Sequence, residues 1–210
     1  MPPHDSHVKN FLQRNSRFYV SAERHKAGCA LTHTFLDGWN GGRLAVAPAS
    51  MDEFLEHVAH DVALDGMDPG ATPRMPPLNE LRTPVFCYYI DFDIATPADA
   101  PVDVDMLASV VTRQVARFMP GAAMYSLVLT APVKTLRDGK CKQGVHMHFP
   151  HVFVTTHEAL VMREAVIVAL EANGALAHVD WPNAFDNNPY VSETGGLRML
   201  GAPKAGTCPT

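Results

Sequence analysis

Cysteine is scarce in this sequence, and its distribution excludes several classes of protein. None of the four cysteines belongs to a Cys-x-x-Cys pair, so the sequence predicts neither a disulfide framework nor a complete zinc site. No apolar run is long enough to span a membrane, and residues 1–12 lack the apolar centre of a signal peptide. We therefore expect an intracellular protein, cytoplasmic or nuclear, in a reducing compartment and without a membrane partner.

Positive charge is in deficit too. The 210 residues include 17 Lys and Arg against 22 Asp and Glu, which gives a formal net charge of -5. This balance argues against indiscriminate nucleic-acid binding, but it allows a local basic groove. The sequence also has no internal repeat and no low-complexity tract. With 47% hydrophobic residues, its length suits one compact domain, 1–210, with a sizeable core.

Residues 85–94 have the pattern of a β-strand. Aromatic and β-branched residues dominate this stretch, and a proline bounds it on each side. Alternate side chains of a strand share a face, so one face should enter a core while the other carries Asp91 and Asp93. The expected core face consists of Phe86, Tyr88, Ile90, Phe92 and Ile94.

Asp91 and Asp93 would lie side by side on this strand. Two neighbouring carboxylates repel each other on a half-buried surface unless a cation lies between them, and hard divalent ions such as Mg²⁺ bind carboxylate oxygens. One interpretation is therefore a metal platform on a strand. The other is a pair of solvated aspartates at a strand end, and this stretch alone does not decide between them.

The element order predicts an α+β fold. From residue 85 on, the hydrophobic periodicity indicates β-α-β-β-α-β, the RRM- or ferredoxin-like arrangement, with helices over 103–118 and after a capping box at Thr155 and Glu158. Its last strand is expected near residues 197–200. We place this module in a lobe over 81–210, packed with a smaller N-terminal α/β unit over 1–80.

The N-terminal unit is expected to contain one long helix. Ser50 and Glu53 have the spacing of a capping box, which predicts that the helix begins there. The apolar residues that follow predict its buried stripe, which consists of Phe54, Leu55, Val58 and Val62.

A second chemically marked stretch spans residues 142–151. On a strand, His146 and His148 would share a face, and Gly144 would let a ligand or another backbone come close. A His-x-His pair suits a transition metal, whereas a histidine near Lys142 suits an anionic phosphate. The alternative is a strand with partly buried histidines bonded to their neighbours. A strand with two aspartates in the same sheet favours a site.

A third stretch combines an acid with basic residues. Asp186 precedes two asparagines, Arg198 lies in an apolar run where we expect it to be held in place, and Lys204 follows. Arginine offers a bidentate fork for phosphate and lysine a point charge. The densest basic patch of the chain precedes the histidine strand, at one end of the expected sheet, where a phosphate chain or a template strand could lie. It consists of Lys134, Arg137, Lys140 and Lys142.

Together these residues have the composition that nucleotidyl transfer needs. Three acids can hold two divalent ions, one of which activates a 3′-hydroxyl while the other bridges the phosphates and steadies the pyrophosphate that leaves. The neighbouring cations can hold a triphosphate.

At this point the sequence resembles the archaeo-eukaryotic primase superfamily, and most closely its primase-polymerases and the primases of large DNA viruses. The first motif of the family is an acidic pair at a strand end, and the second is a small residue, any residue and His, with Lys two residues earlier. The third is a hydrophobic residue and Asp, then Tyr, with an Arg-x5-Lys tail. The matches, in order, are Asp91 and Asp93; Lys142, Gly144 and His146; and Phe185, Asp186, Tyr190, Arg198 and Lys204.

The resemblance implies roles for these residues. Asp91, Asp93 and Asp186 would bind two Mg²⁺ or Mn²⁺ ions. The triphosphate would contact Lys142, His146, Arg198 and Lys204, with Gly144 and His148 beside it and Arg43 as a further contact to template or nucleotide. Lys134, Arg137 and Lys140 would contact single-stranded DNA. The implied partners are template, primer, nucleoside triphosphates and a replicative helicase.

The sequence departs from the family pattern in three places. Gly144 stands where relatives usually have Ser, which removes a hydroxyl, and His148 is often aliphatic in relatives. Relatives often carry a zinc-binding module beyond the core, which suggests that Cys208 is the first ligand of such a module and that the chain is a catalytic fragment. We predict a DNA primase-polymerase core. The alternatives are a metallohydrolase that uses the His-x-His and Asp-x-Asp strands, and a non-catalytic RRM-like binder of single strands.

Overall fold

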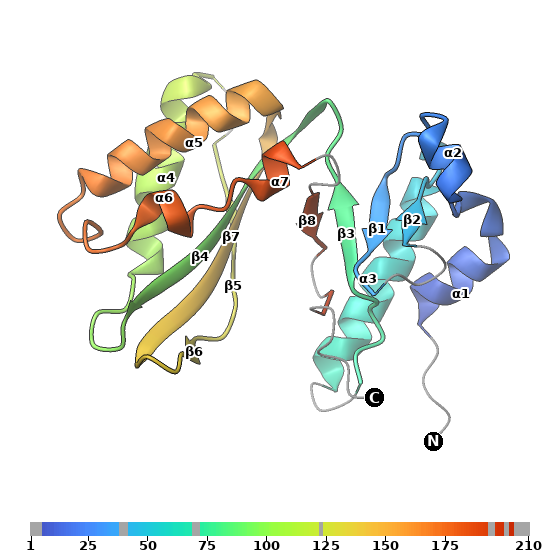
Figure 1. The fold of residues 1–210 in the computed structure, drawn as a ribbon, viewed down its shortest axis with the longest axis horizontal. Helices are drawn as coiled ribbons and strands as arrows, with labels where there is room; N and C mark the ends of the chain where they lie inside the picture. The colour runs from blue at the N-terminus through green and yellow to red at the C-terminus, as the bar shows by residue number, and fades with distance from the viewer. Residues whose placement is uncertain are drawn as a thin grey trace. The chain divides into compact units, whose positions relative to one another are not determined.

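The computed structural model describes residues 6–37, 42–68, 72–121, 124–192, 196–199 and 202–203. Its chain divides into two compact units (Figure 1). We call the first the N-terminal unit; it contains the residues up to Arg82 together with the segment that begins at Gly196. The second, the central unit, spans Thr83–Gly195. The fold is mixed α+β, with one antiparallel sheet in each unit.

The N-terminal unit is built on a sheet of short strands in the order β2-β1-β3-β8. Helices α1 and α3 pack against each other, and their apolar faces share a core with this sheet that includes Phe11, Phe54, Leu44 and Leu78. The strands are β1 (His33–Phe35), β2 (Arg43–Leu44), β3 (Leu78–Leu81) and β8 (Gly196–Arg198). The helices are α1 (His7–Arg14), α2 (Ala22–Lys26) and α3 (Met51–Met67), with 3₁₀ turns η1 (Ser16–Phe18) and η3 (Pro48–Ser50).

Helix α3 begins where the sequence predicts, but two details of that prediction are wrong. Ser50 does not cap the helix, because η3 runs directly into α3 and leaves Ser50 at φ -115° and ψ 4° instead of the extended conformation of an N-cap. Leu55 is exposed, whereas the acidic Asp61 is fully buried. The Asp61 carboxylate accepts hydrogen bonds from the Ser6 hydroxyl (2.8 Å) and from the N–H groups of His7 (2.9 Å) and Val8 (3.1 Å).

The central unit is built on longer strands in the order β4-β7-β5, all antiparallel, with β6 paired to β7. Figure 1 shows α4 and α5 on the same face of this sheet. The strands are β4 (Val85–Pro97), β5 (Leu127–Thr130), β6 (Lys134–Thr135) and β7 (Lys140–Thr155). The helices are α4 (Val104–Phe118), α5 (Thr156–Glu171), α6 (Trp181–Ala184) and α7 (Asn188–Val191). The predicted capping box at Thr155 and Glu158 is confirmed.

The predicted last strand of the module lies elsewhere. Strand β8 pairs with β3 of the N-terminal unit, not with β4, so the segment from Gly196 on leaves the lobe that the sequence predicted for it. A Cβ atom on Gly196 would lie 2.0 Å from the Glu80 carbonyl oxygen, so this pairing requires glycine. Beside β4, a single antiparallel bridge between Phe92 and Phe185 occupies the place of a further strand.

The two faces of β4 and β7 differ as the alternation predicts. Ile90 pairs with Met147 and Phe92 with Val145, and all four side chains are fully buried. Asp91 pairs with His146, and Asp93 with Gly144, on the opposite face. The expected core residues Phe86, Tyr88 and Ile94 are buried as well. The buried face therefore anchors the sheet, and the other face presents polar side chains.

Candidate functional site

Asp91 and His146 form the centre of the polar face. The register places them directly opposite each other on β4 and β7, and His146 Nε2 lies 3.1 Å from Asp91 Oδ1. The two side chains are only 24% and 20% exposed. At this distance the imidazole N–H can donate a hydrogen bond to the carboxylate.

Asp93 has a cation of its own. Lys142 Nζ lies 2.9 Å from Asp93 Oδ2, and both side chains are about half exposed. Lys142 is paired in register with Ala95, so it reaches Asp93 diagonally across the two strands. The group beside each carboxylate is therefore a side chain of the protein, an imidazole for Asp91 and an ammonium for Asp93. Among the described residues, no three His, Cys, Asp or Glu side chains form a ready-made metal cluster.

Asp186 is brought to β4 through its backbone. Its N–H donates to the Asp91 carbonyl at 2.9 Å, next to the bridge between Phe92 and Phe185. The Asp186 side chain accepts a hydrogen bond from the Asn188 N–H at 2.9 Å, which is the turn that the asparagines predict. The backbone of the third acid is thus bonded to the backbone of the first.

Tyr190 of the third motif has a structural contact. Its hydroxyl donates to the Tyr89 carbonyl, and the Tyr89 hydroxyl donates to the Pro189 carbonyl at 3.1 Å. Tyr190 is fully buried, and this burial raises the pKa of its phenol well above the usual value. The two tyrosines therefore fasten α7, which begins two residues after Asp186, to β4.

His148 lies two residues from His146 on the same face of β7. Burial lowers the pKa of His148, the nearby His146 lowers it further, and Asp91 opposes the shift. The imidazole is therefore mainly neutral at pH 7. A neutral imidazole can accept or donate a hydrogen bond, but it adds no positive charge for a phosphate.

The predicted basic patch lies on the β6–β7 hairpin. Lys134 is paired in register with Lys142, and Gly139 takes φ +81° in the turn between the strands. Lys134, Arg137 and Lys140 are exposed. Through β7, this hairpin is continuous with the pair of Lys142 and Asp93. The result is a local positive surface next to an acidic one in a protein of negative net charge.

Gly144 has room for a side chain. An added Cβ would meet only the Ala131 Cβ atom, at 3.5 Å, which is an ordinary contact distance. Packing therefore does not require glycine at this position.

The remaining predicted contacts lie outside the central unit. Arg43 is on β2 and Arg198 on β8, both in the sheet of the N-terminal unit. Arg198 is paired in register with Asn79 and is partly buried. Lys204 and Cys208 lie outside the described residues. Within the central unit, the structure thus groups the three acids, the two histidines and Lys142 around β4 and β7.

The sequence interpretation missed one charged residue near this site. Arg163 is on the buried face of α5, and it donates to the carbonyl groups of Pro182 and Phe185, just before Asp186. Its position between Met162 and Val166, on an apolar helix face, is the feature of the sequence that could have indicated a buried charge.

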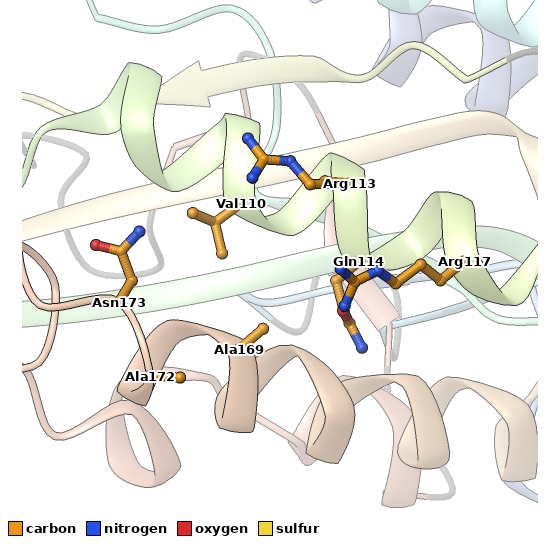
Figure 2. Close-up of a pocket in the computed structure, with 7 residues that line it drawn as sticks. All are labelled: Val110, Arg113, Gln114, Arg117, Ala169, Ala172 and Asn173. Atoms are coloured by element: carbon orange, nitrogen blue, oxygen red, sulfur yellow. The ribbon is translucent and has the colours of Figure 1, made fainter.

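A pocket in the central unit lies apart from these residues. Figure 2 shows it between α4 and α5, with Arg113 and Arg117 projecting from α4 and Asn173 just beyond the end of α5. Its lining contains no predicted site residue. The pocket belongs to the helical layer, whereas Asp91 and His146 are carried by the strands.

Comparison with known families identifies the class of domain. The family model of the C962R protein N-terminal AEP domain matches residues 32–209, a range that holds all three motifs. The chain therefore belongs to this family, whose AEP domain is the archaeo-eukaryotic primase domain of a viral primase-like protein. No curated protein matches the chain. Among the described helices, none is long and apolar enough to cross a membrane.

Proposed function

We propose that this chain is the catalytic core of a DNA primase-polymerase, which joins nucleotides to a 3′-hydroxyl on a single-stranded DNA template. The observation that carries the proposal is the grouping at β4: Asp91 and Asp93 share its polar face, and Asp186 is hydrogen-bonded to the Asp91 backbone. Membership of the primase domain family supports the same reading. The RRM-like arrangement is part of the proposal, with the Phe185 bridge in place of its last strand.

The donor set fits the metal that the family implies. Carboxylate oxygens are the ligands that Mg²⁺ and Mn²⁺ prefer, and Asp91, Asp93 and Asp186 would hold them. The bound ions would activate the 3′-hydroxyl and neutralise the charge on the phosphates. A metal bound there would compete with His146 and Lys142 for Asp91 Oδ1 and Asp93 Oδ2.

This competition suggests how the basic residues act. With Asp91 and Asp93 engaged by metal, Lys142 and His146 would be free to donate hydrogen bonds to phosphate oxygens of the incoming nucleotide. In the free protein, their pairing with the acids limits carboxylate repulsion and keeps the site formed. Metal binding and triphosphate binding should therefore promote each other.

The other predicted contacts complete the proposal. Lys134, Arg137 and Lys140 would bind the phosphate backbone of the template, which makes template affinity dependent on salt. Arg198 and Lys204 would contact the triphosphate, and Arg43 would contact the template or the nucleotide. We propose that the protein acts in DNA replication and that a replicative helicase is its partner.

Primer extension tests this function. The purified chain is given labelled nucleotides and Mg²⁺ or Mn²⁺ on single-stranded DNA, with and without an annealed primer. We expect incorporation by the wild type and a loss of at least 100-fold in Asp91→Ala, because a metal ligand is removed. Asp105→Ala, which removes an exposed acid from the first turn of α4, is the matched control and should remain active.

Other outcomes would favour the alternatives. Incorporation that persists in folded Asp91→Ala would refute the site assignment. Zinc or iron bound after purification, with no incorporation, would favour the metallohydrolase that uses His146 and His148. Template binding without metal and without incorporation would favour the non-catalytic binder.

A further inference from the structure

Arg163 occupies an uncommon place for an arginine. It lies on the face of α5 that also buries Met162, Val166 and Leu170, and it is only 7% exposed. Burying a guanidinium group is costly unless its N–H groups are paired. The partners of Arg163 therefore indicate what the residue does.

Most of these partners belong to one segment, the short helix α6 and the residue that follows it. Arg163 Nη2 lies 2.7 Å from the Pro182 carbonyl oxygen and 2.7 Å from that of Phe185, and Nε lies 3.1 Å from the Phe185 oxygen. The guanidinium carbon also lies 5.2 Å from the centroid of the Phe185 ring. On its outer side, Nη1 pairs with the exposed Glu164 at 2.6 Å.

The Phe185 carbonyl belongs to the same peptide group as the Asp186 N–H. In a trans peptide these two groups point in opposite directions. Arg163 bonds the oxygen of this peptide, and the Asp91 carbonyl accepts its N–H at 2.9 Å. The peptide is therefore held from both sides, by α5 and by β4. This arrangement fixes the plane from which the Asp186 side chain projects.

Packing reinforces the same peptide. The Phe185 ring is fully buried and meets the Phe92 ring edge to face, with centroids 4.8 Å apart. Phe92 is the residue between Asp91 and Asp93. The apolar contact and the two hydrogen-bonded ends thus join Asp186 to the strand that carries the other two acids.

We propose that Arg163 is a positioning residue, which sets the affinity of the three-carboxylate site for divalent metal by fixing the Phe185–Asp186 peptide. The inference rests on the proposed function in that it takes Asp186 as a metal ligand. Arg163 itself touches neither metal nor substrate. Lysine cannot replace it fully, because a single ammonium nitrogen cannot reproduce the paired contact of Nε and Nη2 with the Phe185 oxygen together with the contact of Nη1 with Glu164.

Metal binding in Arg163→Lys tests the proposal without requiring activity. Free Mn²⁺ is measured by electron paramagnetic resonance during titration of each protein. We expect Arg163→Lys to bind Mn²⁺ about 10- to 100-fold more weakly than the wild type, the range for residues that orient metal ligands. Arg117→Lys, on the exposed side of α4, is the matched control and should bind as the wild type does.

A double mutant separates positioning from a general loss of structure. If Arg163 acts through Asp186, Arg163→Lys should weaken Mn²⁺ binding no further in an Asp186→Ala background. In the metal-free protein, the Asp186 amide should exchange with solvent faster in Arg163→Lys, while amides within β7 keep their rates.

The outcomes decide the proposal in both directions. Unchanged Mn²⁺ affinity in folded Arg163→Lys, or an equal further loss in the Asp186→Ala background, would overturn it. Arg163→Gln serves as a second variant, and failure of both single variants to fold would assign Arg163 to fold stability instead. If the wild type incorporates nucleotide and Asp91→Ala does not, the proposed function stands even where this inference fails. If Arg163→Lys binds Mn²⁺ more weakly but the wild type incorporates no nucleotide, the inference about Arg163 stands and the proposed function fails.

Discussion

Each of the two units buries one charged side chain against the backbone of another segment. In the N-terminal unit, Asp61 of α3 accepts hydrogen bonds at the start of α1, where the N–H groups of a helix lack partners. In the central unit, Arg163 of α5 donates to carbonyl groups at the end of α6. The signs of the charges are opposite because the backbone groups to be satisfied are opposite.

The segments that are held in this way differ in function. The start of α1 carries none of the predicted site residues, whereas the segment held by Arg163 continues directly into Asp186. A buried charge that bonds the backbone of another segment therefore joins two helices in one unit and places an acid beside β4 in the other. If this distinction is correct, removing Asp61 should affect stability alone, while altering Arg163 should affect metal binding.

The largest effect is expected from Asp61→Ala. This change removes a charged acceptor from two backbone N–H groups, each bond being worth about 2 kcal/mol, so the free energy of unfolding should fall by about 4 kcal/mol. Urea denaturation followed by circular dichroism measures the loss. Asp52→Ala, which removes an exposed acid from the first turn of the same helix, is the control and should cost less than about 1 kcal/mol.

The comparison also requires that Asp61→Ala leave the central unit intact. Under conditions in which the Asp61→Ala variant is folded, its Mn²⁺ affinity should equal that of the wild type. A weakened affinity comparable to that of Arg163→Lys would mean that the two buried charges serve the same purpose.

Part of this organisation could be predicted from the sequence. The alternation in residues 85–94 predicts the core face of β4 correctly, since side chains alternate along a strand, although Tyr89, close to a register shift, is buried as well. Thr155 caps α5 as predicted because capping is a local interaction. Ser50 does not, because the preceding 3₁₀ turn changes its backbone conformation. Local rules succeed where no neighbouring element alters the backbone.

The features that could not be predicted depend on contacts between distant segments. The hydrophobic pattern of a helix predicts that charged residues lie on its exposed face, so it does not predict the burial of Asp61 and Arg163. The backbone groups that these two side chains satisfy are distant in sequence or lie in another element. The pairing of β8 with β3 has the same origin, because either sheet could accept an apolar strand around Leu197. The grouping of the three acids was expected only through the motif order, and its geometry depends on these non-local bonds.

A wholly or partly buried histidine in each unit gives a second comparison, in which the expected change in the free energy of unfolding is intermediate in size. In the N-terminal unit, burial lowers the pKa of His33 to about 4. The unfolded chain, in which His33 titrates near 6.5, therefore binds more protons below that pH, and folded stability falls as pH decreases through the interval from about 6.5 to about 4. Between pH 7 and pH 5, the loss should be about 2 kcal/mol.

His33→Gln should remove this part of the acid sensitivity, which urea denaturation at pH 7 and pH 5 measures. Glu80, the register partner of His33, has a pKa raised by burial, so its protonation on acidification partly offsets the loss in the wild type. His148 in the central unit also has a pKa lowered by burial, but the nearby Asp91 opposes this shift, so His148→Gln should remove less acid sensitivity than His33→Gln. The comparison fails if the two variants show equal changes in acid sensitivity.

The smallest effect is expected at a pair of glycines, one in each unit. Gly144→Ser places a side chain where only the Ala131 Cβ atom is near, at 3.5 Å, and it removes the conformational freedom of glycine from a strand. We expect the free energy of unfolding to rise by about 0.5 kcal/mol. Gly196→Ser is the contrasting variant, because its Cβ would lie 2.0 Å from the Glu80 carbonyl oxygen and would separate β8 from β3. Thermal unfolding distinguishes the two, and a Gly144→Ser variant as destabilised as Gly196→Ser would show that β7 needs glycine beside Asp93 for a reason other than packing.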